Sequence, residues 1–321
     1  MRRRLLSPSL AVLGSAVALV AMVGCSSSSG SDDSGGSGGT GKAGSAPEVA
    51  STPKLTSTTD QSMPVEAYLL SMDQQEQMNN AVVALRRQCM QRFGLTYQYQ
   101  PIQGNFQPKS ITQFRYGVTD ADAVAVHGYK PAGSEKEVVK PTPQKESPAT
   151  TMVLTGTTDP HVKPGSAAAK GGQDYNGQKV PAGGCLGEAN RKLGASGPNG
   201  FSDAEIAVKV NAESFDKAYT DSRVRAVFAK WSQCMKEKGY TYADPMKAND
   251  DPEWQKTATA TPREQQVASA DVACKQKHNV LGVWYAVDVA YQKQMIEQNA
   301  EPLAEVKKKI EKQLKLAAEV S

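Results

Sequence analysis

Five cysteines are the residues of this 321-residue chain whose type and spacing most clearly indicate chemistry. A thiol can form a disulfide, bind a metal, attack a substrate or carry a covalent lipid. Cys25 ends an apolar N-terminal stretch, whereas Cys89, Cys185, Cys234 and Cys274 are spread through the rest of the chain. The two settings predict two different roles.

The N-terminal segment has the layout of a bacterial secretory signal. Three arginines at positions 2–4 precede an apolar stretch over residues 10–23, which is short for a membrane span. The stretch ends in Gly24-Cys25 and resembles a lipobox, whose cysteine is lipid-modified and becomes the new N-terminus. We therefore predict a signal peptide over residues 1–24 and a lipidated Cys25. An ordinary cleaved signal and a membrane-spanning helix are the alternatives, and the Sec and twin-arginine export routes both stay open.

Low-complexity sequence follows the predicted lipid site. Residues 25–62 are dominated by Ser, Gly and Thr, offer no apolar face to bury, and predict a disordered tether. Within it, residues 36–42 mimic the G-x4-G-K phosphate loop. A true loop joins a hydrophobic strand to a helix and ends in Ser or Thr, but here Ala43 follows and no strand precedes. No nucleotide site is predicted.

Two of the remaining four cysteines, Cys89 and Cys234, fall in an internal repeat. Residues 88–97 align with residues 233–242 without gaps, and six of ten positions are identical, including a Cys-Met pair, a Gly and a Thr-Tyr pair. Each copy predicts a helix that carries its cysteine on an apolar face and stops at the glycine. One further cysteine follows each copy.

An even number of cysteines in an exported chain predicts disulfides. Four cysteines allow three pairings, and the repeat favours Cys89–Cys185 with Cys234–Cys274, one bridge for each copy. A zinc site is the main alternative to disulfides, but it requires closely spaced cysteine pairs that this chain lacks. We predict two disulfides and no metal site.

Other residue types give no catalytic constellation. The three histidines, His127, His161 and His278, lack metal-ligand spacing to one another or to acidic residues. An acidic cluster before Trp254 is explained by helix capping at Asp251-Pro252 rather than by a calcium loop. We predict no catalytic residue and no cofactor.

The sequence around the cysteines shows mostly helical patterns. Apolar residues recur at spacings of three and four from Met78 to Phe93, and Thr261-Pro262-Arg263-Glu264 is a strong helix start. We predict an all-α fold of disulfide-linked helical hairpins in two similar halves behind the tether. The first half spans residues 63–195 with a long loop over 131–180. The second spans 196–321 and ends in a long helix kinked at Pro302.

Charge excludes a nucleic-acid-binding role. The chain has 37 Lys+Arg and 33 Asp+Glu, a formal net charge of +4. Removing the three arginines of the predicted signal, which contains no acidic residue, leaves 34 minus 33, or +1. Nucleic-acid binding requires clustered excess cations, which a near-neutral chain does not supply.

Three segments carry a resemblance. Residues 231–240, around Cys234-Met235, residues 271–275, Asp-Val-Ala-Cys-Lys, and residues 180–185, Val-Pro-Ala-Gly-Gly-Cys, resemble uncharacterised secreted lipoproteins of high-GC Gram-positive (actinobacterial) bacteria. The resemblance covers roughly residues 1–130 and 175–300. It implies a surface lipoprotein and assigns no active site.

These observations favour a lipid-anchored, non-enzymatic protein on the outer face of the cytoplasmic membrane. It would act as an interaction or accessory subunit of a cell-envelope complex, with a protein or cell-wall partner and no nucleic acid. A ligand-binding lipoprotein of a transport system is the first alternative, and a cell-envelope hydrolase is the second. The absence of alternating strand and helix patterns disfavours the former.

Overall fold

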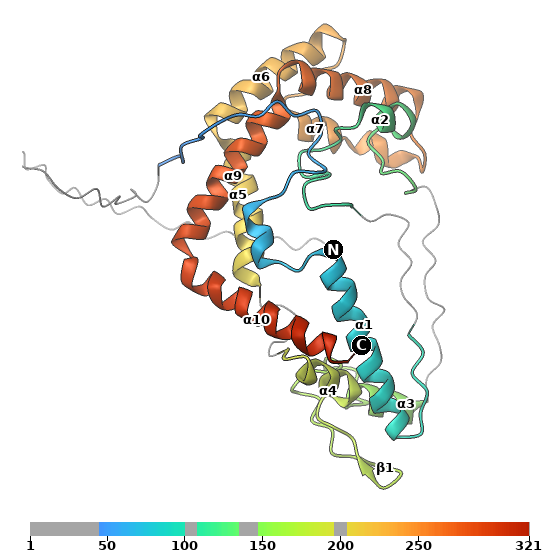
Figure 1. Ribbon diagram of the computed structural model, residues 1–321. Helices are drawn as coiled ribbons and strands as arrows, with labels where there is room; N and C mark the ends of the chain where they lie inside the picture. The colour runs from blue at the N-terminus through green and yellow to red at the C-terminus, as the bar shows by residue number, and fades with distance from the viewer. Residues whose placement is uncertain (1–44, 100–107, 135–146, 196–203, 321) are drawn as a thin grey trace, which may run out of the picture. The chain divides into compact units, whose positions relative to one another are not determined.

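Helices form most of the described chain (Figure 1). The computed structural model describes residues 45–99, 108–134, 147–195 and 204–320. These residues form the α-helices α1 (Met72–Arg92), α2 (Ala121–His127), α3 (Pro148–Thr155), α4 (Gly184–Lys192), α5 (Glu205–Thr220), α6 (Ser222–Glu237), α7 (Pro245–Asn249), α8 (Pro262–Lys277), α9 (Val280–Gln298) and α10 (Ala300–Ala318). They also form the 3-10 helices η1 (Pro64–Tyr68) and η2 (Pro252–Lys256) and a hairpin of β1 (Asp174–Tyr175) and β2 (Gln178–Lys179). The all-α prediction is confirmed.

Capping residues set most helix boundaries where the sequence predicts them. Thr261 accepts a hydrogen bond from the backbone N–H of Glu264 at 3.2 Å and begins α8. Gly94 and Gly239 follow α1 and α6 with φ of 71° and 89°, the left-handed region that glycine adopts most easily. Asp120 is the N-cap of α2, and its side chain accepts from the backbone N–H groups of Asp122 and Ala123.

The long C-terminal helix is interrupted earlier than the sequence predicts. The expected kink at Pro302 is a break at Asn299, which ends α9 at Gln298 and precedes α10. Proline has no N–H to donate to the carbonyl of residue 298, and its ring clashes with that carbonyl. The helix therefore ends there, and Pro302 lies in the first turn of the next helix.

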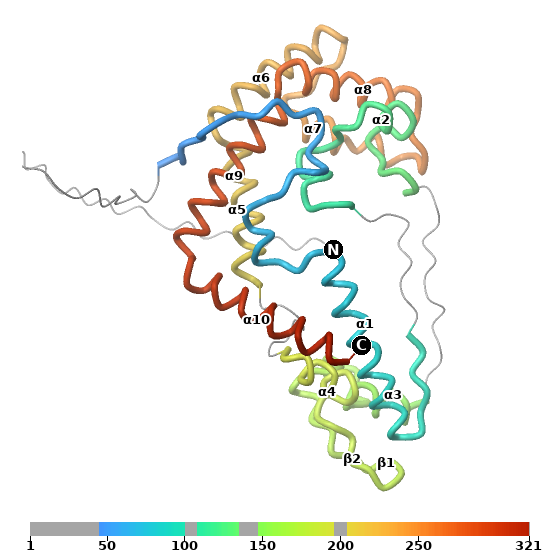
Figure 2. Tube along the Cα trace, viewed as in Figure 1, coloured from blue at the N-terminus to red at the C-terminus, as the bar shows by residue number. Residues whose placement is uncertain are grey.

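The largest apolar core combines segments from both predicted halves. Tyr116 lies in the sequence of the first half, yet its ring centroid is 5.0 Å from that of Trp284 on α9. Trp284 also meets Phe228 of α6 edge-on, with centroids 4.8 Å apart. In addition, the C-terminal end of α10 packs against α1, as the chain trace shows (Figure 2). Segments on both sides of the predicted boundary at residues 195 and 196 therefore contact one another, and Ser45–Ser321 forms one unit.

The predicted disordered tether extends too far along the chain. Thr58 is fully buried and donates a hydrogen bond to the carbonyl of Thr112 at 2.8 Å. Asn279 donates to the carbonyl of Pro53 at 2.9 Å and accepts from the N–H of Leu55 at 3.2 Å. Residues 45–62 are thus held by side chains that satisfy their backbone, a contact that composition cannot reveal. Residues 1–44, with Cys25 and the predicted signal, lie outside the described residues.

The predicted long loop over 131–180 also contains ordered elements. Ser147 caps α3 by accepting from Thr150 N at 3.1 Å, and Pro148 is its first residue. Asn176 and Gly177, with φ of 51° and 75°, form the two-residue turn between β1 and β2. The composition suggested a loop because Pro and Gly are frequent here, but Pro148 begins a helix and Gly177 forms a hairpin turn. Residues 135–146 of the predicted loop lie outside the described residues.

Candidate functional site

Two disulfides join the repeat helices to their partners. Cys89 of α1 bonds to Cys185 of α4, with Cα atoms 5.5 Å apart. Cys234 of α6 bonds to Cys274 of α8, with Cα atoms 5.8 Å apart. This is the pairing that the repeat favours. Disulfides of this kind are typical of an oxidising, extracytoplasmic environment.

The bonded cysteines are structural groups in this state of the protein. All four are at most 3% exposed, and each lies on the apolar face of its helix. A sulfur held in a disulfide is neither a thiolate nucleophile nor a metal ligand. Arg92 lies beside the first bridge, with Nη2 3.5 Å from Cys89 Sγ and 2.5 Å from Glu188 Oε2.

The histidines are scattered rather than gathered. His127 ends α2, His161 is exposed in the chain after α3, and His278 is the C-cap of α8. Burial lowers the pKa of His278, and the nearby Lys277 and Lys230 lower it further. Within the described residues, no three His, Cys, Asp or Glu side chains come together to hold a metal ion.

Two residues of the acidic cluster before Trp254, Asp244 and Asp251, serve as helix caps. Asp244 accepts from Lys247 N at 3.1 Å at the start of α7, and Asp251 accepts from Glu253 N at 2.9 Å at the start of η2. Asp251 also accepts from the Tyr242 hydroxyl at 2.9 Å. The capping prediction for Asp251-Pro252 is confirmed.

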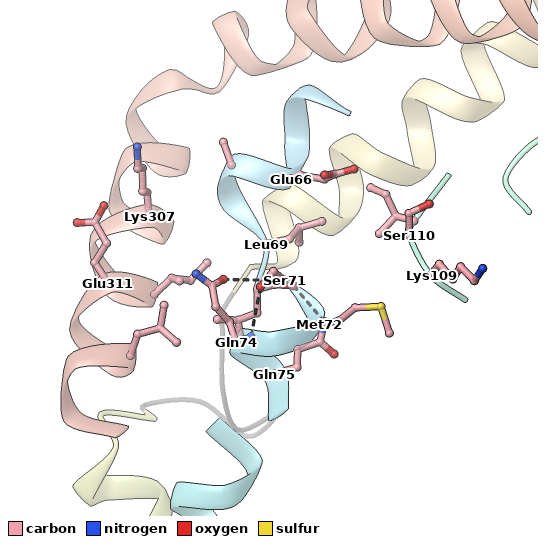
Figure 3. A pocket seen from close by; sticks show the side chains of 15 residues that line it. Glu66, Leu69, Ser71, Met72, Gln74, Gln75, Lys109, Ser110, Lys307 and Glu311 are labelled. Atoms are coloured by element: carbon pink, nitrogen blue, oxygen red, sulfur yellow. Dashed lines mark hydrogen bonds between the residues drawn. The ribbon is translucent and has the colours of Figure 1, made fainter. Parts of the chain in front are cut away.

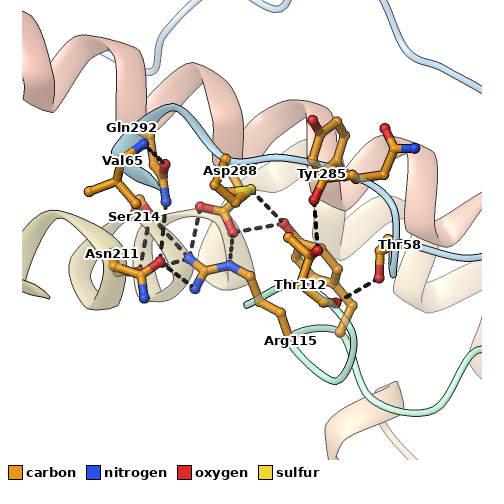
Figure 4. A network of polar contacts seen from close by, with 12 residues as sticks. Thr58, Val65, Thr112, Arg115, Asn211, Ser214, Tyr285, Asp288 and Gln292 are labelled. Carbon is orange, nitrogen blue, oxygen red and sulfur yellow. Dashed lines mark hydrogen bonds and ion pairs between the residues drawn. The ribbon is translucent and has the colours of Figure 1, made fainter. Parts of the chain in front are cut away.

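A buried polar network centred on Arg115 and Asp288 is the most elaborate charged arrangement in the described residues (Figure 4). Arg115 donates from Nε to Asp288 Oδ2 at 2.6 Å and from Nη2 to Oδ1 at 3.1 Å. The same guanidinium donates to Asn211 on α5, at its carbonyl at 2.7 Å and its Oδ1 at 3.0 Å. Tyr116 donates to Asp288 Oδ2 at 2.9 Å.

The polar groups of this network form their hydrogen bonds with one another. Burial and the Asp288 charge raise the pKa of Tyr116 well above its usual value, so its hydroxyl stays a donor. Burial lowers the pKa of Arg115, but the hydrogen bond and charge of Asp288 outweigh burial and leave it raised. Asp288 is fully buried and accepts three hydrogen bonds from these two residues. The network therefore ties α5, α9 and the 112–118 segment together.

Two further buried ion pairs fasten α8. Lys275 donates to Asp271 Oδ2 and to the carbonyl of Val118, both at 2.9 Å, and neither charged side chain is exposed. Burial raises the pKa of Asp271, while Lys275 opposes that shift. Lys130 donates to Glu264 Oε2 at 2.5 Å. The i,i+4 spacing of Asp271 and Lys275 is visible in the sequence, but nothing there indicates that both are buried.

An apolar groove lies where η1, the start of α1 and α10 meet (Figure 3). Its volume is about 530 Å³, and its apolar wall is formed by Leu69, Leu70, Met72, Ile111, Ile310 and Leu314. Met72 and Ile111 are 43% and 40% exposed, which is unusual for large apolar side chains. Lys307 and Glu311 lie on its α10 side. Sequence reasoning missed this groove because its walls come from three separate segments.

A second cavity, the polar hollow, has a volume of about 570 Å³. Hydroxyl, amide and charged side chains line much of it: Thr59, Asp60, Lys109, Gln113, Asp120 and Lys130. Phe114 contributes an aromatic ring to the lining. The residues come from the 57–60 turn, the 109–120 segment and the chain after α2, so their sequence positions gave no sign of a shared site.

Known proteins give no independent guide to these sites. No protein-family model matches the chain, and neither a curated protein nor a solved structure matches it significantly. None of the helices in the described residues is long and apolar enough to cross a membrane. The resemblance to actinobacterial secreted lipoproteins remains a prediction from the quoted segments.

Proposed function

We propose that this protein is a lipid-anchored extracytoplasmic protein that acts as a non-enzymatic interaction or accessory subunit of a cell-envelope complex. One observation carries the proposal: two fully paired disulfides follow an N-terminal segment that ends in Gly24-Cys25. Disulfides persist in oxidising compartments, which supports export. The lipobox-like end of the segment supports attachment to the outer face of the cytoplasmic membrane.

The lipid on Cys25 provides the membrane contact in this proposal. Each methylene of an acyl chain buried in the bilayer contributes about 0.8 kcal/mol, and more than one chain is needed for stable anchoring. Radiolabelled palmitate is expected to enter the wild-type protein and the Ser26→Ala control, but not Cys25→Ala. Equal labelling of Cys25→Ala would contradict the anchor.

The interaction role is tested by chemical crosslinking in intact cells, followed by affinity purification of the full chain from membranes. A specific protein or wall polymer is expected with the wild type. Its yield should fall with Cys25→Ala, because anchoring raises the effective concentration of a membrane-bound partner. Recovery of a transporter would favour the alternative of a ligand-binding lipoprotein, and recovery of no partner would contradict the interaction role.

A further inference from the structure

The walls of the polar hollow are tied together by side-chain hydrogen bonds. Thr58 donates to the carbonyl of Thr112 at 2.8 Å, and Thr112 in turn donates to the carbonyl of Gln61 at 2.7 Å. Both threonines are fully buried. These two bonds hold the 57–61 turn against the segment that carries Gln113 and Phe114, and so fix one wall.

Charged groups fix another part of the lining. Asp120 uses Oδ1 to cap α2, accepting from the N–H groups of Asp122 and Ala123, both at 3.0 Å. Lys130 is held by Glu264 and by the carbonyl of Trp254 at 2.6 Å. The hollow is therefore preformed, and a ligand would not have to order its walls, which reduces the entropic cost of binding.

Hydrogen-bonding capacity remains inside this preformed hollow. Among the described residues, the Asp60 carboxylate and the Lys109 ammonium group have no hydrogen-bond or ion-pair partner. Both bonds of the Asp120 helix cap go to Oδ1, so Oδ2 takes no part in the cap. The lining thus offers free acceptors on two carboxylates and a free donor on a lysine, so a suitable ligand must both donate and accept.

The charge of the hollow selects among polar ligands. Glu264 neutralises Lys130, which leaves Asp60 and Asp120 against Lys109 and disfavours an anion. A neutral polyhydroxyl ring donates to carboxylates and accepts from an ammonium group without that repulsion. The half-buried Phe114 adds an apolar surface, against which the C–H face of a sugar ring can pack.

We propose that the polar hollow binds a neutral N-acetylated hexose unit of a wall glycan. The ligand identity rests on the extracytoplasmic location of the proposed function, whereas the site rests on the geometry of the hollow. Asp60 and Asp120 accept hydrogen bonds from sugar hydroxyls, and Lys109 donates to a ring or acetamido oxygen. The protein would then contact the wall glycan through this site while the lipid holds it to the membrane.

The test is isothermal titration of the full-length protein in detergent with the β-1,4-linked tetramer of N-acetylglucosamine. Saturable binding is expected for the wild type. The double variant Asp60→Ala/Lys109→Ala removes two charged hydrogen-bonding groups, and its Kd should rise by at least about tenfold. The matched control Asp216→Ala/Lys217→Ala removes an exposed pair of the same types on α5 and should leave Kd unchanged.

Circular dichroism of all three proteins should show the same helix content, because Asp60 and Lys109 are exposed. Absence of saturable binding by the wild type would overturn the proposal, and so would an equal Kd for wild type and site variant. Binding of free lysine or glycine in preference to the tetramer would also overturn it. None of these results affects palmitate labelling at Cys25, so failure of the site and failure of the anchor are distinguishable.

Discussion

Lys130 and Glu264 form an ion pair, with Nζ and Oε2 2.5 Å apart, that joins the chain after α2 to the first turn of α8. Glu264 lies at the third position of α8, where an acidic side chain often bonds back to the N-cap residue, here Thr261. Thr261 does cap the helix, but the Glu264 carboxylate also accepts from the N–H of Tyr129 at 3.1 Å. The Glu264 side chain therefore holds Tyr129 and Lys130, in the chain after α2, against α8.

Removing this carboxylate should therefore destabilise the protein through a distant contact. Glu264→Ala leaves Lys130 without its anion and Tyr129 N–H without its acceptor, and we expect a loss of about 3 kcal/mol in the free energy of unfolding. Urea denaturation followed by circular dichroism measures it. Glu305→Ala is the control, because its pair with Lys308 is about 70% exposed and water screens the attraction, so the loss should be much smaller. Equal losses in the two variants would show that burial of Glu264 has no energetic consequence.

Stability should fall in acid partly through Asp221. The hydrogen bond from Arg223, opposed by burial, lowers the pKa of this carboxyl below its usual value. A lowered folded-state pKa gives stability that is complete above the unfolded-state pKa, about 3.9, and is lost as pH falls through the folded-state pKa.

The variant Asp221→Asn isolates this contribution because the amide keeps an oxygen for the N-cap of α6. Denaturation midpoints measured from pH 7 to pH 2 should fall less steeply for Asp221→Asn than for wild type below about pH 4. Parallel curves would mean that Asp221 titrates alike in the folded and unfolded protein.

The two disulfides should contribute comparable stability. They close chain segments with sequence separations of 96 and 40 residues. The chain-entropy model gives about 5 and about 4 kcal/mol for loops of these sizes. The paired variants Cys89→Ser/Cys185→Ser and Cys234→Ser/Cys274→Ser should lower the denaturation midpoint accordingly.

Non-reducing peptide mapping checks the pairing directly. Peptides containing Cys89 with Cys185, and Cys234 with Cys274, are expected from the wild-type protein. A peptide joining Cys89 to Cys234 is incompatible with the contacts of α1 with α4 and of α6 with α8.

A glycine contact beside the first disulfide should be intolerant of any side chain. A Cβ on Gly156 would lie 2.5 Å from the backbone nitrogen of Gly184, and its φ is 79°. Gly172 has a φ of 88° but nothing within 4 Å of its Cβ position. Gly172→Ala should therefore lower the free energy of unfolding by roughly 1–2 kcal/mol, because alanine is strained in the left-handed conformation. Gly156→Ala should lower it distinctly more, because the added Cβ also clashes with the backbone of Gly184. Thermal unfolding compares the two, and equal midpoints would refute the close backbone approach.

Local signals in the sequence predicted several helix boundaries and favoured the observed cysteine pairing. Thr261 with Pro262, Asp251 with Pro252 and the glycines after α1 and α6 act through atoms a few residues away, so their effect is readable without tertiary contacts. The repeat around Cys89 and Cys234 is also a signal that can be recognised without tertiary contacts. Each copy predicts a helix with an inward cysteine, and each is followed by one partner.

Tertiary structure alone decided which polar residues are buried and which segments meet. Arg115 and Asp288 are 173 residues apart in sequence, and no local pattern distinguishes them from surface charges. Residues 45–62 have the composition of a tether, yet the side chains of Asn279 and Thr112 satisfy backbone groups of this segment from far along the chain. The polar hollow depends on the same long-range contacts. Capping, turn formation and the repeat require only neighbouring atoms, whereas burial of a charge requires partners that only the folded chain brings within hydrogen-bonding distance.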